Sequence, residues 1–471
     1  MRRGRSPPNC APTPRLRDAV IAVVLAAGLG TRMKSATPKV LHRVCGKPML
    51  RWVVDAARGA GAKRVIVVVS TQGEAVRAAF PDCEIALQKR QRGTGDALRA
   101  AAPLLRGGQA PVLVLYGDTP LLRAETLRRL ARARGRHPLA IVTFRPPVAS
   151  GYGRVVREDG RVVRIVEEKD ATSAERRIEE ANAGMVVANA AFLARALGRL
   201  RPSKRTGELY LTDLVAMASH AGGAASVEVD DPLQVLGVNH RADLAVAAGA
   251  MRGRIVEAHM RAGVTFEAPA RAAVGAAVRI GADTTIGAGV ELRGATVVGA
   301  GCRIDAGCIL TDARVDDGAT ILPYSVITES VVGAGARIGP FAHLRPGSEI
   351  GAGAHVGNFV ETKKTRLGEG AKANHLAYLG DTEVGARANI GAGTITCNYD
   401  GFAKHRTVIE EGAFIGSNTE LVAPVRVGAG AYVGAGSTIT RDVPPGALAL
   451  TRAPLRTIDG YAARLRKQRG G

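Results

Sequence analysis

Residues 279–304 read RIGADTTIGAGVELRGATVVGAGCRI, and an aliphatic residue returns at every sixth position of this stretch. Two later runs keep the same period, from Val326 to Val356 and from Ile409 to Ile439. Glycine directly follows many of the aliphatic residues, and it permits the tight corners that a flat-sided coil needs. The repeat therefore predicts a parallel β-helix with one aliphatic side chain pointing inward from each face of a triangular coil. The first run consists of Ile280, Ile286, Leu292, Val298, Ile304 and Leu310.

The three aliphatic runs are out of phase with one another. The phase changes predict insertions at about 311–325, 357–383 and 391–408. A packed solenoid expels extra residues as loops, and loops often carry the functional side chains. We therefore expect a functional site in the last two of these segments.

The composition excludes several classes of protein. The 471-residue chain is 46% hydrophobic and 23% charged, which excludes a disordered chain and allows more than one domain. The net charge of +23 would suit nucleic acid, but the basic residues are spread out and no run of five occurs. No apolar run approaches the roughly 18–20 residues that cross a bilayer. We therefore expect neither a nucleic-acid partner nor stable membrane insertion.

The N-terminus has two interpretations. Residues 1–18 are basic and rich in proline, and the apolar run 19–27 follows, as in a secretory signal. The alternative is a basic flexible tail before a buried strand. Cleavage after an apolar run here would destroy the glycine-rich turn described below, which favours the tail. The six cysteines form no CxxC pair, as expected of free thiols in a reducing compartment, so we expect a cytoplasmic protein.

The first half of the chain alternates β-branched runs with amphipathic stretches. Helices are expected at 49–60 and 124–134, and an alanine-rich linking helix at 244–262. This alternation predicts an α/β domain with a mostly parallel, Rossmann-like sheet, whose ligands bind beyond the carboxyl ends of the strands. The expected strands are Val20–Leu25, Val65–Val69, Val112–Leu115, Ala140–Phe144 and Met185–Ala188.

A glycine-rich turn follows the first expected strand and reads AAGLGTR over residues 26–32. Its glycines let backbone N–H groups approach an anion, and Arg32 adds positive charge. The spacing matches neither the dinucleotide fingerprint nor a P-loop. With the continuation TPKVL over 37–41, the stretch resembles the signature of nucleotidyltransferases that join nucleoside triphosphates to sugar phosphates. The resemblance implies that Arg32 and Lys39 act on the reacting phosphates.

Other segments of the first half resemble the same family. Asp118 follows an expected strand, where a carboxylate suits a metal bridging phosphates. The resemblance implies that Asp118 and Asn239 bind Mg²⁺ as the cofactor. Asn182 is followed by Ala183, where the family usually has threonine, which is a small departure. The resemblance assigns UTP and UDP-N-acetylglucosamine binding to Leu25, Ala26, Ala27, Gly28, Gly30, Lys39, Gln88, Gly93, Thr94, Tyr116, Gly117, Asp118, Gly153, Glu167, Asn182 and Asn239.

A second candidate site interrupts the repeat. His375 has Lys363, Lys364 and Lys372 near it in sequence. Cations suit a sugar phosphate, and a neutral imidazole suits deprotonation of an amine. With these segments, residues 20–455 resemble the family of bifunctional N-acetylglucosamine-1-phosphate uridylyltransferases and glucosamine-1-phosphate acetyltransferases. The motifs FAHLRPG over 341–347 and ANIGAGTITCNYDG over 388–401 belong to the acetyltransferase part of this resemblance.

The family resemblance implies the roles of the second site. His375 is the expected general base, and Glu361 shares its pocket. The resemblance also implies a left-handed β-helix and a homotrimer in which neighbouring subunits complete each acetyltransferase site. The amino-sugar phosphate is expected at Arg345, Lys363, Tyr378 and Asn389, and acetyl-CoA at Asn398, Tyr399, Ser417, Ala435 and Arg452.

The expected domain order follows from both halves. A uridylyltransferase domain over 19–243 is followed by a linker helix over 244–264, a β-helix acetyltransferase domain over 265–455 and a tail over 456–471. The expected function is acetyl transfer from acetyl-CoA to glucosamine 1-phosphate, then uridylyl transfer from UTP with release of pyrophosphate. The product would feed peptidoglycan and lipopolysaccharide precursors.

Two other functions remain open to the sequence. One is a single-activity nucleotide-sugar pyrophosphorylase with a regulatory β-helix, against which the intact His375, Arg345 and Asn398 argue. The other is a non-enzymatic scaffold that uses the basic surface, which would bind nucleic acid in a salt-sensitive way and turn over no UTP.

Overall fold

A computed structural model describes residues 20–105 and 110–469. The predicted basic tail over 1–18 lies outside these residues, as does the end of the C-terminal tail at 470–471. The chain divides into two compact units, 1–251 and 252–471, within helix α7 (Arg241–Arg261). The predicted domain boundaries stay a prediction. Among the described residues, no helix has the length and apolar character to cross a membrane.

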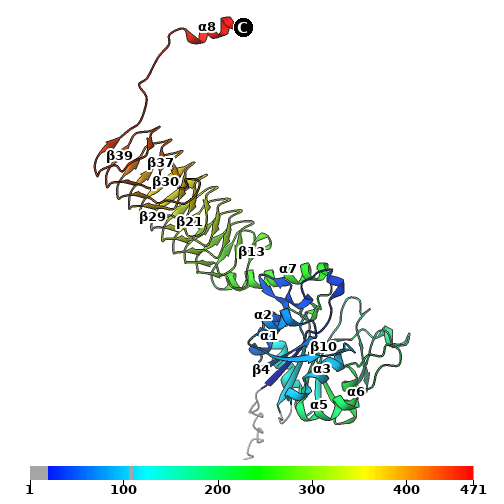
Figure 1. The fold of residues 1–471 in the computed structure, drawn as a ribbon. Helices are drawn as coiled ribbons and strands as arrows, with labels where there is room; N and C mark the ends of the chain where they lie inside the picture. Colours follow the sequence, from blue (N-terminus) through cyan, green and yellow to red (C-terminus); the bar gives the residue numbers. More distant parts are fainter. Residues whose placement is uncertain (1–19, 106–109, 470–471) are drawn as a thin grey trace, which may run out of the picture. The chain divides into compact units, whose positions relative to one another are not determined.

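The first unit is built on a nine-stranded sheet in the order β5-β4-β1-β6-β10-β7-β11-β9-β8. Strand β1 (Val20–Leu25) lies between β4 (Ala62–Ser70) and β6 (Pro111–Tyr116), with β5 (Glu84–Gln88) beyond β4. These four strands are parallel, so their carboxyl ends meet at one edge of the sheet (Figure 1).

The prediction of a mostly parallel sheet is confirmed, and the exceptions are two strands in the other half of the sheet. Strand β10 runs antiparallel to both β6 and β7, and β9 runs antiparallel to β8 and β11. A parallel return needs a crossover, usually a helix. Between β7 and β10 the chain instead forms the β8–β9 hairpin and a short 3₁₀ turn. The strands are β7 (Leu139–Phe144), β8 (Arg154–Glu158), β9 (Arg161–Val166), β10 (Ala181–Asn189) and β11 (Ala224–Glu228).

Two hydrophobic cores cover the two faces of this sheet. Alternate residues of β1 point to opposite faces, so that Ile21 and Val23 pack in one core and Ala22 and Val24 in the other. Helices α3, α5 and α6 contribute to the first core, and α1, α2 and α4 to the second. The helices are α1 (Met49–Gly59), α2 (Glu74–Ala79), α3 (Thr94–Ala101), α4 (Ala124–Arg134), α5 (Ala190–Ala196) and α6 (Asp213–His220).

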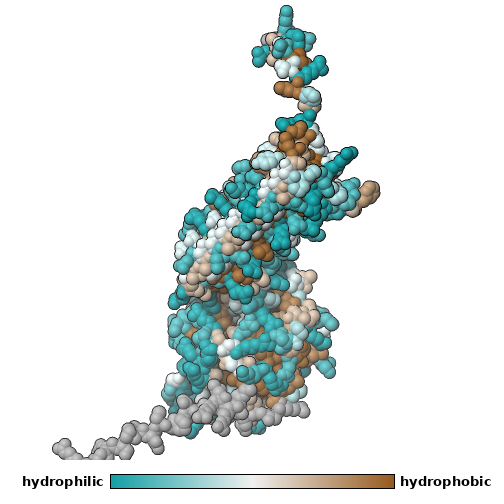
Figure 2. Space-filling view, turned by 90° about the vertical axis from the view of Figure 1, so that its left-hand side faces the viewer, coloured by the Kyte–Doolittle hydropathy of each residue, from teal (hydrophilic) through white to brown (hydrophobic). Residues whose placement is uncertain are grey.

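The second unit is a coil of short parallel strands, and this confirms the predicted β-helix (Figure 1). Inward residues stack from coil to coil: Ile286 pairs with Ile304 and Ile304 with Ile321, and all three are fully buried. Outward residues leave a largely hydrophilic face (Figure 2). The three sheets run from β12 (Thr265–Phe266) to β41 (Leu448–Ala449), from β13 (Ala273–Val274) to β40 (Thr438–Ile439), and from β14 (Arg279–Ile280) to β38 (Val425–Val427). A last helix, α8 (Tyr461–Gln468), follows.

The predicted insertions at 311–325 and 357–383 are wrong. There the inward positions step by five residues instead of six at some corners, for example from Leu310 to Val315 and from Thr362 to Leu367. In a six-residue repeat, the deletion of one residue shifts the phase by the same amount as the insertion of five residues. The sequence pattern could therefore not distinguish a shortened corner from an inserted loop. Each short corner holds one non-glycine residue with positive φ. These residues are Asp312, Glu329, Lys364 and Asp381.

Only the third predicted insertion is a loop. Thr396 and Ile409 are successive inward residues, and residues 398–406 between them leave the coil. The five-residue steps also move one inward position from the predicted Val326 to Ile327. Ile327 is fully buried, while Val326 is only half-buried.

This shift of phase makes a testable prediction for the stability of the β-helix. Ile327→Ala should lower the free energy of unfolding of the second unit by about 3 kcal/mol, because it leaves a cavity in the coil. Val326→Ala should cost less than about 1 kcal/mol, because that side chain lies outside the stack. Urea titration followed by circular dichroism measures both. A larger loss for Val326→Ala would contradict the observed register.

Candidate active sites

The glycine-rich turn leads from β1 into a 3₁₀ turn over Thr31–Met33, and a second 3₁₀ turn over Lys39–Leu41 carries Lys39. Gly30 has a φ of 63°, and a Cβ there would lie 2.6 Å from the Cβ of Lys39. Glycine is therefore required for the turn to pack against this lysine. Gly28 is exposed, with no atom within 4 Å of where its Cβ would be, so its backbone is open to a ligand.

Two cationic side chains and two oxygen-bearing side chains meet beside this turn. Lys39 Nζ donates to Asp118 Oδ2 at 2.5 Å and to Asn239 Oδ1 at 3.4 Å. Arg32 Nη2 donates to Asn239 Oδ1 at 2.8 Å. Asp118 follows β6 and Asn239 precedes α7, and the backbone bond from Val238 N to Asp118 O joins the two segments. The structure thus brings together all four residues proposed to act on phosphates and metal.

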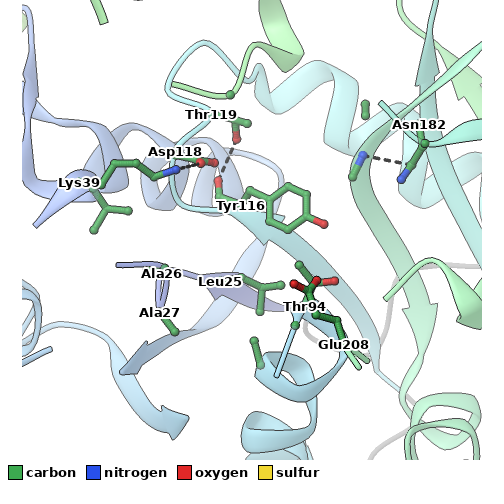
Figure 3. A pocket seen from close by; sticks show the side chains of 18 of the residues that line it. Leu25, Ala26, Ala27, Lys39, Thr94, Tyr116, Asp118, Thr119, Asn182 and Glu208 are labelled. Atoms are coloured by element: carbon green, nitrogen blue, oxygen red, sulfur yellow. Dashed lines mark hydrogen bonds and ion pairs between the residues drawn. The ribbon is translucent and has the colours of Figure 1, made fainter. Parts of the chain in front are cut away.

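A cavity of about 470 Å³ opens beside this cluster at the carboxyl ends of the parallel strands. All predicted nucleotide-binding residues line it except Gly30, Gly117 and Asn239. Each of these three residues contacts a residue that lines the cavity. Gly30 packs on Lys39, Gly117 N donates to Leu25 O, and Asn239 Oδ1 accepts from Lys39. Figure 3 shows Lys39 reaching Asp118, with Tyr116 drawn between Asp118 and Asn182.

One end of the cavity carries Tyr116 and Glu167. Gly184 has a φ of 80°, and its Cβ would lie 2.0 Å from Tyr116 Cε2, so only glycine leaves space for this ring. Burial raises the pKa of Tyr116. Burial also raises the pKa of Glu167, although the hydroxyl of Thr212, which donates to Glu167 Oε1 at 2.8 Å, opposes this. A Cβ on Gly153 would lie 3.4 Å from Glu167 Oε2.

The start of α3 forms another part of the cavity wall. Gln88, at the end of β5, donates from Nε2 to Gly93 O at 3.3 Å and to Asp96 Oδ2 at 3.1 Å. Gly93 has a φ of 99°, and its Cβ would lie 2.6 Å from Leu209 O. The loop before α3 is therefore packed tightly against the segment before α6.

The residues that line the cavity without having been assigned a role by sequence analysis include Gln91, Glu208 and Val235. Gln91 donates from Nε2 to Ala27 O at 2.6 Å and so joins the loop before α3 to the glycine-rich turn. Glu208 comes from the segment that pairs with the α3 loop through Leu209, and Val235 ends the 3₁₀ turn Pro232–Val235. No local pattern marks these residues, because only long-range backbone pairing brings them to the cavity.

The β-helix places His375 on an exposed edge. It lies at the end of β30 (Lys372–His375), beside Asn358 at the end of β27 (His355–Asn358). The distance from His375 Nδ1 to Asn358 Oδ1 is 2.7 Å. An amide oxygen can only accept, so Nδ1 carries the proton and Nε2 keeps its lone pair in the neutral ring. This tautomer suits a base that acts through Nε2.

Three of the four predicted sugar-phosphate residues lie on or beside the next sheet, and Asn389 is the exception. Arg345 Nη1 donates to Glu361 Oε1 at 2.7 Å. Contact with Lys404, together with the charge of Arg345, lowers the pKa of Lys363, as expected where cations crowd together. Tyr378 pairs with Glu361 on this sheet, and Asn389 lies two coils from Asn358 on the sheet of His375.

The predicted acetyl-CoA residues divide into two groups. Asn398 Nδ2 donates to Asp381 Oδ2 at 2.6 Å, and a Cβ on Gly380 would lie 2.5 Å from Tyr378 Oη and 2.7 Å from Asn398 Nδ2, so Tyr378 and Asn398 are neighbours. Tyr399 is exposed beside Asn398. Ser417, Ala435 and Arg452 lie further along the coil, since Gly436 N donates to Ser417 O and a Cβ on Gly434 would lie 3.4 Å from Arg452 Nη2. Within the described residues, no hydrogen bond or ion pair joins this second group to His375.

An open groove of about 480 Å³ also lies on the β-helix. None of the predicted acetyltransferase residues lines it. Its cationic side chains include Lys364, Arg366, Lys404 and Arg406, and its acidic ones are Glu349 and Asp381.

Together, the fold and the first site define a nucleotidyltransferase fused to a hexapeptide-repeat transferase. Models of protein families agree: the MobA-like NTP transferase domain matches residues 22–180, the GMPPB C-terminal domain 263–360, and the bacterial transferase hexapeptide (six repeats) 406–441. The chain is 53% identical to a bifunctional protein GlmU of Sorangium cellulosum, covering 97% of both chains. It is 47% identical to that of Pelobacter propionicus and 46% to that of Geobacter sulfurreducens, covering 96% of this chain and all of each relative. The chain belongs to the GlmU family of bifunctional proteins.

The comparisons confirm the sequence expectation of two transferase activities in one chain. They favour neither the single-activity pyrophosphorylase nor the non-enzymatic scaffold. They also agree with the α/β domain followed by a hexapeptide β-helix. The roles of individual residues remain predictions, because membership of a family does not test them.

Gly184 allows a direct test of the first cavity. Gly184→Ala should lower kcat/KM for uridylyl transfer at least about tenfold, because its methyl group displaces the Tyr116 ring and strains a backbone with positive φ. Gly198→Ala is the matched control, since no atom lies within 4 Å of its Cβ position. Acetyl transfer, measured in parallel, should be unchanged in both variants. Full uridylyl transfer by Gly184→Ala would show that the position of the Tyr116 ring is unimportant.

Proposed function

We propose that the N-terminal cavity performs the uridylyl transfer of the family with the residues gathered around Lys39. The phosphate of N-acetylglucosamine 1-phosphate attacks the α-phosphorus of UTP; the new P–O bond forms as the bond to pyrophosphate breaks. No covalent bond to the protein is required. The supporting observation is the cluster of Arg32 and Lys39 on Asp118 and Asn239. Positioning and charge neutralisation are the main tasks in such a transfer.

The surrounding residues would hold the two substrates in line. The exposed backbone of Gly28 can donate to the triphosphate, and Lys39 and Arg32 supply positive charge beside it. Gln88 lies at the proposed base end, and Tyr116, Glu167 and Asn182 lie at the proposed sugar end. The partly enclosed cavity keeps bulk water from the phosphates, which strengthens these charge interactions.

The nucleotidyltransferase reaction of this family depends on a metal ion, and we propose Mg²⁺ held by Asp118 and Asn239. Their oxygen atoms fit a hard cation, and Lys39 Nζ contacts both residues. Within the described residues, no group of three or more His, Cys, Asp or Glu could hold a metal. Two protein ligands fit Mg²⁺, which usually takes its remaining ligands from water and substrate phosphates. When bound, it neutralises phosphate charge.

For acetyl transfer, the proposed base is His375. Nε2 takes a proton from the amine of glucosamine 1-phosphate as the nitrogen attacks the thioester carbonyl of acetyl-CoA. The N–C bond forms, the C–S bond breaks, and the proton can pass to the departing sulfur of CoA. Asn358 holds the ring by accepting from Nδ1, and Arg345 and Lys363 bind the sugar phosphate.

The proposed order is acetyl transfer followed by uridylyl transfer, which yields UDP-N-acetylglucosamine for cell-wall precursors in the cytoplasm. We further propose a homotrimer, with neighbouring subunits completing each acetyltransferase site. The separation of Ser417, Ala435 and Arg452 from His375 along the coil supports this proposal. Acetyl-CoA could then contact one group on each of two subunits.

The two proposed centres should fail independently. Asp118→Asn should reduce uridylyl transfer at least about a hundredfold and leave acetyl transfer intact, because it removes the charged metal ligand. His375→Ala should have the opposite effect, because it removes the base. Separate assays with each substrate pair measure both. Loss of both activities in either folded variant would contradict two separate centres.

The proposed trimer makes a further prediction. Dilution to concentrations at which the trimer dissociates should abolish acetyl transfer while uridylyl transfer per chain stays constant, because only the former site needs a second chain. Activity measured against protein concentration, with light scattering as the control for mass, tests this. Parallel loss of both activities would reject the shared site.

A further inference from the structure

Asp96 is a buried carboxyl group at the base end of the cavity that the mechanism above does not use. It lies in the first turn of α3 and is only 8% exposed. One oxygen, Oδ2, accepts from Gln88 Nε2 at 3.1 Å, and the other, Oδ1, lies 3.4 Å from Arg92 Nη2. A buried carboxylate is costly unless it is paired and hydrogen-bonded. Its partners therefore indicate what the group positions.

The surroundings of Gln88 allow only one orientation of its amide. Both Asp96 Oδ2 and the carbonyl oxygen of Gly93 can only accept hydrogen bonds, and Gln88 Nε2 contacts both. If the amide were turned over, its carbonyl oxygen would face two acceptors. The NH₂ group must therefore point away from the ligand space, and both of its hydrogens are used.

The remaining atom, Gln88 Oε1, is left for a ligand. Gln88 is 4% exposed and lines the cavity. Among residues 20–105 and 110–469, no hydrogen bond reaches Oε1. Some buried polar atoms of the chain have neither exposed surface nor a hydrogen-bond partner, but Oε1 is not one of them. The oxygen is therefore accessible from the cavity. The Gln88 side chain therefore offers a ligand in the cavity a hydrogen-bond acceptor but no hydrogen-bond donor.

We infer that Asp96 is a positioning residue that fixes the Gln88 amide so that the base end of the cavity selects a pyrimidine bearing an N3–H group. Uracil donates from N3, whereas cytosine has a lone pair at N3 that would face Oε1. A site that requires one hydrogen bond rejects the analogue that lacks the donor, because a buried polar group is then left unpaired. This inference rests on the proposed binding of UTP with its base at Gln88.

The test is the ratio of kcat/KM for UTP to that for CTP, measured with saturating N-acetylglucosamine 1-phosphate. Asp96→Asn keeps the shape of the side chain but replaces one acceptor with a donor, so the Gln88 amide can turn over. The ratio should fall about tenfold, mainly through faster turnover of CTP. A merely structural role would lower both values together and leave the ratio unchanged.

Arg92→Ala is the matched control. It removes the more exposed ion pair of Asp96 but keeps the hydrogen bond to Gln88, so the ratio should stay at the wild-type value. An equal fall in Arg92→Ala would overturn the inference, because the loop rather than the amide orientation would then set the preference. Circular dichroism and thermal unfolding report that each variant is folded.

Two further measurements separate this inference from the proposed function. Gln88→Leu should also reduce the ratio; if the ratio is unchanged, the proposed position of the base is wrong. A reduced ratio in Gln88→Leu with an unchanged ratio in Asp96→Asn would overturn only the role of Asp96. Wild-type enzyme should use N3-methyl-UTP as poorly as CTP, and normal turnover of this analogue would overturn the inference without any variant.

Discussion

The contact of Lys39 with Asp118 and Asn239 is the interaction on which the first active site depends. These three residues come from a 3₁₀ turn, the end of a central strand and the start of α7, and the Lys39 ammonium group contacts both oxygen-bearing side chains. Arg32 binds the same amide oxygen. The arrangement concentrates positive charge and hard oxygen ligands at one end of the cavity. A triphosphate and a divalent cation require both.

The nucleotidyltransferase sheet explains why distant motifs converge. Four parallel strands end at the same edge, and Gly28, Gln88 and Asp118 each follow or end one of these strands. Sequence analysis could place these residues together because parallel strands share a carboxyl edge. It could not place Gln91 or Glu208, whose positions depend on backbone pairing between the α3 loop and the segment before α6. Nor could it predict the antiparallel β10, which depends on a hairpin instead of a crossover helix.

The β-helix shows a different limit of sequence analysis. Its six-residue period predicted the architecture because every inward side chain must stack on the coil below. The same period misplaced two insertions, since a shortened corner and a longer insertion produce the same phase. The structure resolves this through Ile327, which is buried although the expected aliphatic position was Val326. The one true loop, after Thr396, carries Asn398 and Tyr399, which are predicted to meet acetyl-CoA.

The most direct test of the central claim is anomalous diffraction from crystals grown with Mn²⁺ and UDP-N-acetylglucosamine, the product of the proposed reaction. The account predicts one peak at about 2.2 Å, close to the ligand distance of Mg²⁺, from a carboxylate oxygen of Asp118 and the amide oxygen of Asn239. Lys39 Nζ should then contact a phosphate oxygen. A metal bound by other side chains, with Lys39 still paired to Asp118, would contradict the account.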